Sequence, residues 1–207
     1  NNEEIQKIFA DAVIQSHYIL RGCSINGNRC VSNNVHPINT LADLKGMKIR
    51  VPQSDLYIKM VEAWGASATP MNINELYMAL QTGTVDGQDN PLPTVQSAKF
   101  YEAQKSISLT NHLVDSVWPT INLNTWNKLT DTQKGWVMEA VEAGREACDS
   151  QNLKTESEVQ DFLKEQGLTI YEADVAAFAD HVLNTYLNDP ISDSWDKDLL
   201  AEIQAMA

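Results

Sequence analysis

The sequence predicts an α/β fold, in which a lobe built on a parallel-rich sheet is flanked by helices and one long helix runs beyond it. Two stretches predict the sheet. Residues Met47 to Met71 follow a strand, helix, strand pattern, and a second helix, Leu76 to Gln81, then leads on to Val85. Parallel strands need helical crossovers of this kind, which are right-handed and place helices on the faces of the sheet. A third stretch, after Thr130, predicts the long helix.

The chain begins with a predicted helix and a predicted hairpin. Apolar residues recur at helical spacing from Glu3 to Ser16, which is typical of one buried face. Tyr18 to Leu20 and Cys30 to Ser32 then predict two strands, and the Asn26-Gly27 pair between them is a strong hairpin signal. Arg29 falls at the edge of the second strand.

The three cysteines form no metal-binding or redox motif. If Cys23 and Cys30 face each other across the hairpin, a disulfide between them would stabilise the fold by about 2 to 3 kcal/mol in the chain-entropy model. Such a disulfide would suit an oxidising compartment. The alternative, which the sequence favours equally, is two reduced thiols on strands. Cys148 lies in a helical pattern and is expected to be a small buried residue.

The strand from Met47 to Val51 alternates apolar and basic side chains. Its apolar residues share one face, which predicts burial in the core, whereas Lys48 and Arg50 share the other face. Pro52 ends the strand, so Arg50 lies at its carboxyl end, where ligands sit in open α/β sheets. A planar guanidinium there could grip a carboxylate through two parallel hydrogen bonds, although a solvated arginine is the ordinary alternative.

Capping signals place the neighbouring helices. Thr40 and Asp43 cap a short helix before the Arg50 strand, and a helix from Leu56 to Trp64 follows that strand. Asn72 or Asn74 begins the next helix, which Gly83 ends.

The segment VDGQDNP, which starts at Val85, is too polar and too rich in glycine for an ordinary buried strand. We therefore expect a loop that presents Gln88, Asp89 and Asn90 to a ligand. A plain surface turn is the alternative, because Asp-Asn-Pro favours turns by itself.

The second half of the chain predicts the remaining elements. Val95 to Gln104 has a helical pattern, and Ile107 to Leu109 and Val114 to Leu123 have strand patterns. Further on, Leu168 to Tyr171 predicts a strand, and two last helices are expected to begin at Asp174 and Ser194.

The long helix should begin at a capping box of Thr130 and Gln133 and continue to Gly167, which gives a length on the order of 50 Å. Its ends are apolar and its middle, near Ser150, is polar, as in a strut that joins two bodies. Two helices broken near Ser150 are the alternative. Trp136 lies on an apolar stripe of this helix, and Trp64 lies on a similar stripe earlier in the chain, so both are expected in the core. Trp118, by contrast, could border a cleft.

The composition excludes several classes of function. Of the 207 residues, 43% are hydrophobic, and the net charge of −13 argues against binding to nucleic acid or to anionic membranes. No stretch approaches the roughly 20 apolar residues that span a bilayer. The opening NNEEIQKIFAD is not a signal peptide, so we expect a processed chain or a fragment.

Catalytic and metal-binding motifs are absent from the sequence. The four histidines are scattered without a zinc spacing, and there is no phosphate-binding loop or serine nucleophile elbow. We therefore expect no enzymatic activity, no cofactor and no metal.

Three segments together carry a family resemblance: DLKGMKIRVP, GASATPMNINELYMALQTGTVDGQDNP and KFYEAQKSISLTNH. They resemble the solute-binding proteins of TRAP (tripartite ATP-independent periplasmic) transporters, and the likeness extends from about Ile25 to the end of the chain. The resemblance implies that Arg50 grips a substrate carboxylate, that Arg29 assists and that Asn90 hydrogen-bonds the ligand. Many members carry an aromatic residue where this sequence has Ile73.

The resemblance also implies a function and a location. It implies a periplasmic-binding-protein-like lobe that captures a small organic acid, a sugar acid or a dicarboxylate, and delivers it to the membrane subunits of an ion-gradient-driven transporter in the periplasm. Polar Gln53 and Asn72 near the expected site favour a sugar acid. A sensory domain of a receptor and an enzyme on a two-lobed scaffold are the alternatives.

The resemblance finally suggests how the chain is divided. Residues 1–115 would form the ligand-binding lobe, 116–166 the connecting strand and strut, and 167–207 a strand and helices that pack on the lobe. The first lobe of the family would then be missing. We accordingly expect exposed apolar surface along the first half of the strut and possible self-association of the fragment.

Overall fold

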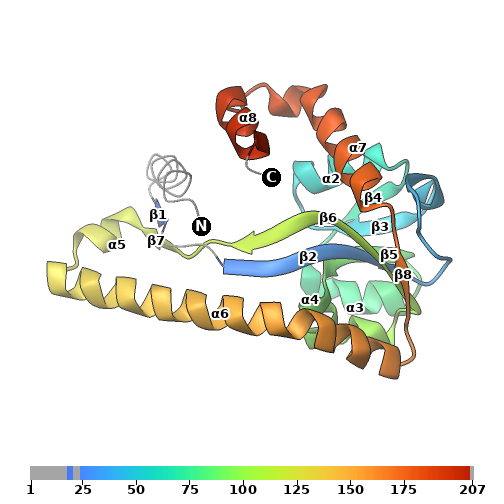
Figure 1. Ribbon diagram of the computed structural model, residues 1–207, viewed down its shortest axis with the longest axis horizontal. Helices are drawn as coiled ribbons and strands as arrows, with labels where there is room; N and C mark the ends of the chain where they lie inside the picture. The colour runs from blue at the N-terminus through green and yellow to red at the C-terminus, as the bar shows by residue number, and fades with distance from the viewer. Residues whose placement is uncertain (1–17, 21–23, 206–207) are drawn as a thin grey trace.

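A mixed sheet of six strands forms the centre of the structure, a computed structural model that describes residues 18–20 and 24–205 (Figure 1). The strand order is β4-β3-β5-β2-β6-β8. The pairs β4/β3, β3/β5 and β6/β8 are parallel, and β2 is antiparallel to both of its neighbours, so the other strands of this sheet all run in one direction. The predicted parallel-rich α/β fold is confirmed. The strands are β2 (Ser24–Asn33), β3 (Lys48–Val51), β4 (Ser67–Pro70), β5 (Gly87–Pro91), β6 (Ser106–Val117) and β8 (Thr169–Glu172).

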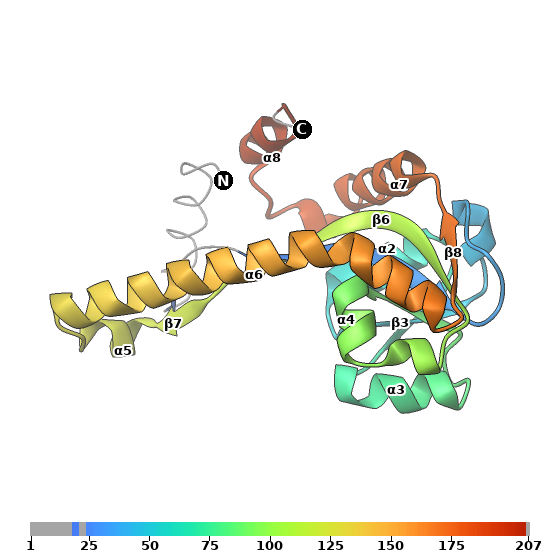
Figure 2. The same ribbon diagram turned by 60° about the horizontal axis from the view of Figure 1, so that its bottom comes forward.

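Helices cover both faces of the sheet (Figures 1 and 2). On one face α2 (Asp55–Ala63) and α7 (Val175–Leu187) enclose a core that contains Ile49 and Val51. On the other face α3 (Ile73–Gln81), α4 (Leu92–Ser97) and the end of α6 (Asp131–Glu165) enclose a core that contains Cys30 and Ile107. Strand β2 contributes to both cores, Val31 to one and Cys30 to the other, because successive side chains of a strand point to opposite faces.

The predicted long helix is confirmed as a single element. Helix α6 has 35 residues and begins at the capping box of Thr130 and Gln133, and it continues without a break past Ser150. Its first half extends away from the sheet beside α5 (Leu123–Asn127) and a two-stranded sheet of β1 (Tyr18–Leu20) and β7 (Thr120–Asn122) (Figure 1). The alternative of two helices is wrong.

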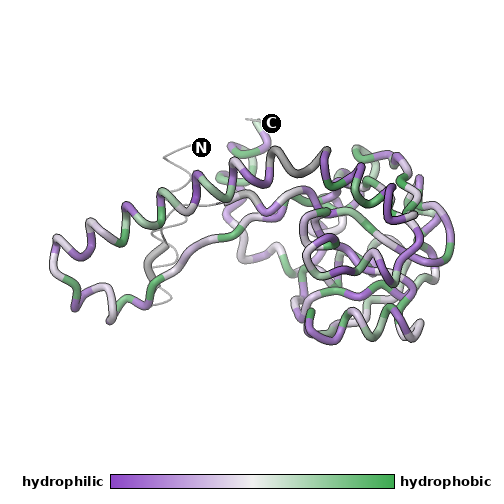
Figure 3. The backbone as a smooth tube through the Cα atoms, turned by 90° about the horizontal axis from the view of Figure 1, so that it is seen from below, coloured by the Kyte–Doolittle hydropathy of each residue, from purple (hydrophilic) through white to green (hydrophobic). Residues whose placement is uncertain are grey.

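The extended half of α6 exposes apolar side chains, as expected. Hydrophilic and hydrophobic residues alternate along it (Figure 3). Trp136 is 63% exposed, so its predicted core position is wrong. Trp64, by contrast, is buried.

The predicted hairpin at Asn26-Gly27 is wrong. Ser24–Asn33 is one continuous strand, and the register with β6 shifts between Ile25 and Gly27, where Gly27 has a φ of 127°. The Asn-Gly pair therefore makes a bulge in a strand that β6 holds along its length. Cys23 and the helix predicted over residues 3–16 lie outside the described residues.

The segment VDGQDNP also differs from its prediction as a loop. Gly87–Pro91 forms β5, a central strand whose five residues are all buried. Polar side chains are tolerated there because they find partners within the sheet, as described below.

Other boundaries shift for local reasons. The helix predicted over Val95 to Gln104 is divided into α4 and a 3-10 turn, η2 (Phe100–Glu102), because Lys99 adopts a φ of 57°. The two strands predicted after it are mostly one strand, β6.

The last helix, α8 (Lys197–Ala205), is capped by Asp196 rather than Ser194, since the Asp196 carboxylate accepts hydrogen bonds from the amides of Asp198 and Leu199. The short turns are η1 (Leu41–Leu44), with the predicted Thr40 and Asp43 capping box, and η3 (Pro190–Ser192).

A glycine substitution tests the position of β5. A Cβ added at Gly87 would collide with the carbonyl oxygen of Ser32 and lie 2.9 Å from Asn33 Cβ. We expect Gly87→Ala to lower the free energy of unfolding of the intact protein by about 1 to 3 kcal/mol in urea denaturation. Gly135→Ala is the control, because nothing lies within 4 Å of its Cβ position in α6 and the change should stabilise by up to about 1 kcal/mol. Equal stability of Gly87→Ala and the parent would contradict the register.

Candidate anion-binding site

A pocket of about 320 Å³ opens where the parallel strands β3 and β5 end. Arg50 reaches it from the end of β3 and Asn90 from the end of β5, and the start of α3 forms another wall. This is the carboxyl edge at which open α/β sheets bind ligands. The lining residues are Arg50, Pro52, Gln53, Met71, Asn72, Ile73 and Asn90. Four predicted site residues, Arg50, Asn90, Ile73 and Gln53, thus lie together.

The Arg50 guanidinium is buried and lacks an acidic partner. Arg50 is 3% exposed. Its Nε and Nη2 both donate to the Met71 carbonyl oxygen, at 3.1 and 2.8 Å. Among the described residues no carboxylate lies within 4.0 Å of it. Burial lowers the pKa of Arg50 from its ordinary value, with Asp89 opposing and Arg29 adding to the shift. A buried charge without a partner is costly, so an anion in the pocket would be stabilised.

The amino-terminal end of α3 adds to the positive potential. Asn72 caps this helix, its Oδ1 accepting the Asn74 amide at 3.0 Å, and Ile73 in the first turn is 43% exposed. Unsatisfied amides at a helix start favour negative charge. The pocket is therefore suited to an anion that also has apolar surface to lay against Ile73.

Arg29 does not line this pocket. It shares a face of β2 with Val31, which packs under α2 and α7, whereas Arg50 lies on the opposite face from Ile49 and Val51. The two arginines therefore project from opposite faces of the sheet. The hydrogen bond of Arg29 to a residue of the pocket is made by Nη2, which lies 3.4 Å from Asn90 Oδ1.

The charge of Arg29 is matched by two carboxylates. Its Nε donates to Asp89 Oδ2 at 2.7 Å, and its Nη1 donates to Asp115 Oδ2 at 3.2 Å. Its Nη2 also donates to the Asp89 carbonyl oxygen at 2.6 Å, and the Tyr57 ring lies 4.8 Å from the guanidinium carbon. The positive charge of Arg29, which the family resemblance assigned to assisting the ligand, is thus largely neutralised by these carboxylates.

Asp89 was expected to face a ligand, but it does not line the pocket and is instead buried against Arg29, a partner that sequence reasoning missed. Its side chain is fully buried beside Arg29, and His112 Nε2 lies 3.5 Å from its Oδ2. Burial would raise the pKa of Asp89, but the His112 imidazole and the Arg29 guanidinium outweigh it and lower the pKa to about 2. Treating GQDNP as a strand would have placed Asp89 on the face of Arg29, since β2 and β5 pair Arg29 with Pro91.

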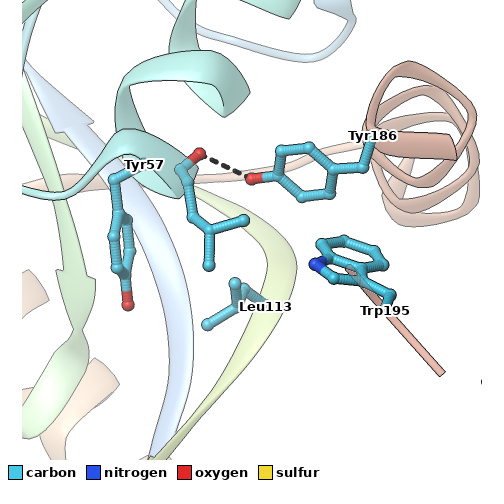
Figure 4. A pocket seen from close by; sticks show the side chains of 5 residues that line it. Tyr57, Leu113, Tyr186 and Trp195 are labelled. Carbon is cyan, nitrogen blue, oxygen red and sulfur yellow. Dashed lines mark hydrogen bonds between the residues drawn. The ribbon is translucent and has the colours of Figure 1, made fainter. Parts of the chain in front are cut away.

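A second pocket, of about 220 Å³, lies on the other face of the sheet (Figure 4). Tyr186 donates its hydroxyl to the Leu56 carbonyl oxygen at 2.7 Å at its rim, and no charged side chain lines it. This cavity is unsuited to an anion. Its lining residues are Leu56, Tyr57, Leu113, Tyr186 and Trp195.

The described residues show neither a metal cluster nor a membrane helix. No group of three His, Cys, Asp or Glu side chains in them could hold a metal ion, and no helix among them is long and apolar enough to cross a bilayer. Trp118, which could have bordered the site, instead donates its indole N–H to Ser116 Oγ at 2.9 Å and does not line the pocket.

The α/β lobe, its cationic pocket and the long helix together define a lobe of a solute-binding protein. The family profile described as bacterial extracellular solute-binding protein, family 7, matches residues 2–189. The chain belongs to this family, whose members are non-enzymatic periplasmic components of TRAP systems.

Two curated relatives and one solved structure show the extent of the similarity. The sialic acid-binding periplasmic protein SiaP of Vibrio cholerae is 40% identical over 162 residues, which are 78% of this chain and 50% of that protein. The 2,3-diketo-L-gulonate-binding periplasmic protein YiaO of Escherichia coli is 38% identical over 77% of this chain and 49% of that protein. The chain thus spans about half the length of these curated relatives.

The solved structure is a TRAP periplasmic solute-binding protein from Roseobacter denitrificans with bound 3-deoxy-D-manno-oct-2-ulosonic acid. It superposes on this chain with a TM-score of 0.93 at 36% sequence identity. The match covers 98% of this chain and 68% of the Roseobacter denitrificans chain. The predicted family and α/β fold are confirmed.

The low pKa of Asp89 makes a prediction about acid stability. The folded pKa of about 2 lies below the ordinary value of 3.8, so the ionised carboxylate contributes stability above about pH 4, which is lost as the pH falls towards 2. We expect Asp89→Asn to lower the free energy of unfolding at pH 7 by about 2 kcal/mol or more and to flatten its decline between pH 4 and 2. Urea denaturation at several pH values measures both effects.

Asp161→Asn serves as the matched control. Asp161 is an exposed partner of Lys164, at 3.2 Å, and its loss should change stability by less than about 1 kcal/mol. An Asp89→Asn variant with the acid profile of the parent would contradict the buried ion pair.

Proposed function

We propose that the intact protein captures a hydroxylated monocarboxylic acid, a sugar acid, outside the cytoplasm and delivers it to the membrane subunits of an ion-gradient-driven TRAP transporter. The observation that carries this proposal is the buried Arg50 guanidinium, which faces a pocket and has no carboxylate partner among the described residues. A ligand carboxylate supplies that partner. No bond is made or broken.

Arg50 is held ready for a two-pronged contact. A guanidinium has five N–H donors, and the Met71 carbonyl oxygen occupies the edge formed by Nε and Nη2. The edge formed by Nη1 and Nη2 remains for a carboxylate, which it matches through two parallel hydrogen bonds. Because Met71 fixes the plane of the guanidinium, little side-chain freedom is lost when the ligand binds.

The charge of the site favours one carboxylate over two. Arg29 is balanced by Asp89 and Asp115, so within the described part of the chain Arg50 is the cation at the pocket that lacks a partner. A second ligand carboxylate would have to be desolvated in the pocket without a matching cation, which is unfavourable. We therefore favour a sugar acid over a dicarboxylate.

Polar and apolar walls suit a hydroxylated chain. Gln53 and Asn72 offer amides to ligand hydroxyls, and Ile73 offers an apolar surface in place of an aromatic ring. The relatives support the same class, since their names or bound molecules are sialic acid, 2,3-diketo-L-gulonate and 3-deoxy-D-manno-oct-2-ulosonic acid.

The proposed organisation of the chain follows from this role. Residues 1–115 provide the binding lobe, 116–166 the connecting strand and strut, and 167–207 the elements that pack on the lobe. A second body that closes over the pocket would exclude water and strengthen the Arg50 contact.

Substitution of Arg50 tests the carboxylate contact. We expect Arg50→Ala and Arg50→Lys in the intact protein both to weaken binding of a sugar acid by a hundredfold or more, because breaking a buried charge pair costs roughly 3 to 5 kcal/mol. Lysine fails because it cannot reproduce the fork. Titration calorimetry provides the measurement.

Arg145→Lys is the control for this pair of variants, since Arg145 lies on α6 in an ion pair with Glu142 and Asp149, away from the pocket. Its affinity should match that of the parent. Binding by Arg50→Lys within a few-fold of the parent would sink the two-pronged contact.

A thermal-shift screen of the intact protein tests the ligand class. A sugar acid at 100 times its dissociation constant should add about 2.7 kcal/mol of stability and raise the melting temperature accordingly. Succinate and malate at the same concentration should give a clearly smaller shift, because their second carboxylate lacks a cation. A larger shift with these dicarboxylates would refute the charge argument.

A further inference from the structure

We propose that a buried chain of hydrogen bonds through Gln88, Ser32 and Gln104 orients the side-chain amide of Asn90, so that Asn90 serves the bound acid as a hydrogen-bond donor. These three residues are positioning residues, since none of them lines the pocket. The inference rests on the proposed function, because it assigns a task to Asn90 within that site.

The links of the chain run from the pocket across the sheet. Asn90 Nδ2 donates to Gln88 Oε1 at 2.5 Å, and Gln88 Nε2 donates to Ser32 Oγ at 2.7 Å. Ser32 Oγ then donates to Gln104 Oε1 at 3.0 Å, and Gln104 Nε2 donates to the Ala103 carbonyl oxygen at 3.1 Å. The chain therefore joins β5 to β2 and continues to the turn before β6.

Both ends of the chain have a fixed polarity. At the pocket end, Arg29 Nη2 points at Asn90 Oδ1 from 3.4 Å, and a guanidinium can only donate. At the far end, a backbone carbonyl oxygen can only accept. Each amide between them must present its oxygen towards Arg29 and its nitrogen towards Ala103. Reversal of the Asn90 amide would set two donors against each other at Arg29 and two acceptors against each other at Gln88.

Burial makes such a reversal costly. Gln88 is 0% exposed, Ser32 1% and Gln104 5%, so water cannot readily replace a lost partner. A buried polar group without a partner is costly, and reversal would leave several. The chain thus fixes one orientation of Asn90 before any ligand arrives.

The consequence for recognition concerns the second N–H of Asn90. The hydrogen bonds found among the described residues use one of the two Nδ2 hydrogens, and the side-chain oxygen is turned to Arg29. The remaining hydrogen is available to an acceptor in the pocket that Asn90 lines. The ligand group at this position must therefore be an oxygen that accepts, such as a carboxylate, ether or hydroxyl oxygen.

Ser32→Ala breaks the chain without touching the pocket. For the sugar acid with the largest thermal shift in the screen above, we expect about tenfold weaker binding by calorimetry, which corresponds to the loss of one ligand hydrogen bond. Ser108→Ala is the matched control, because Ser108 is also a fully buried strand serine whose Oγ accepts the Ile38 amide at 3.0 Å outside the chain. Its affinity should remain within twofold of the parent.

A double-mutant cycle separates positioning from general damage. If Ser32 acts through Asn90, then Ser32→Ala should have no further effect on affinity in an Asn90→Ala background. The proposal is overturned if Ser32→Ala lowers the affinity equally in both backgrounds. It is also overturned if Ser32→Ala keeps the parental affinity, or if Ser108→Ala loses as much affinity as Ser32→Ala.

A measurement without ligand keeps this test independent of the proposed function. In nitrogen-15 NMR spectra, Ser32→Ala should shift the side-chain amide signals of Gln88 and Asn90 and speed their hydrogen exchange, whereas Ser108→Ala should leave both unchanged. Unchanged signals in Ser32→Ala overturn the chain even where sugar acids bind. Failure of all sugar acids in the screen, with the NMR shifts present, refutes the proposed function and the donor role but leaves the chain itself standing.

Discussion

The ion pair between Arg29 and Asp89 is the interaction on which the site depends. It joins β2 to β5 at the centre of the sheet, and both side chains are buried, at 4% and 0% exposure. Since each charge would be costly to bury without the other, the pair fixes the relation of the two strands. It also engages Arg29, whose Nη2 lies 3.4 Å from Asn90 Oδ1. Within the part of the chain that the structure describes, Arg50 is the buried guanidinium at the pocket without a carboxylate partner.

Strand β5 serves both faces of the sheet because its side chains alternate. Asp89 points to the core under α2 and α7, where it meets Arg29 and His112. Gln88 and Asn90 point to the other face, where they continue towards the pocket of Arg50. A run of consecutive polar residues can therefore be fully buried, provided that each has partners on its own side.

The sequence was informative where the argument was local and misleading where it depended on partners. Arg50 at a strand end and Asn72 at a helix start are within a short stretch, so alternation and capping placed both correctly. Asp89 and Arg29 are 60 residues apart, and nothing in GQDNP shows that a cation will lie opposite. The Asn26-Gly27 signal failed for the same reason, because the long strand β6 holds β2 extended through it. Trp136 lies on an apolar stripe of its helix, but spacing along one helix does not show whether another element covers that face, and Trp136 is exposed.

The placement of the two arginines on opposite faces changes what the pocket can select. Had Arg29 and Arg50 both faced the pocket, as the sequence suggested, two unpaired cations would favour a dianion. With Arg29 balanced by Asp89 and Asp115, its proposed contribution is instead the orientation that it gives to Asn90. In the proposed site, selectivity would arise from one charge and one directed N–H rather than from total positive potential. Because both are fixed by buried partners, the Met71 carbonyl for Arg50 and Gln88 for Asn90, the geometry exists before binding, and binding need not create it.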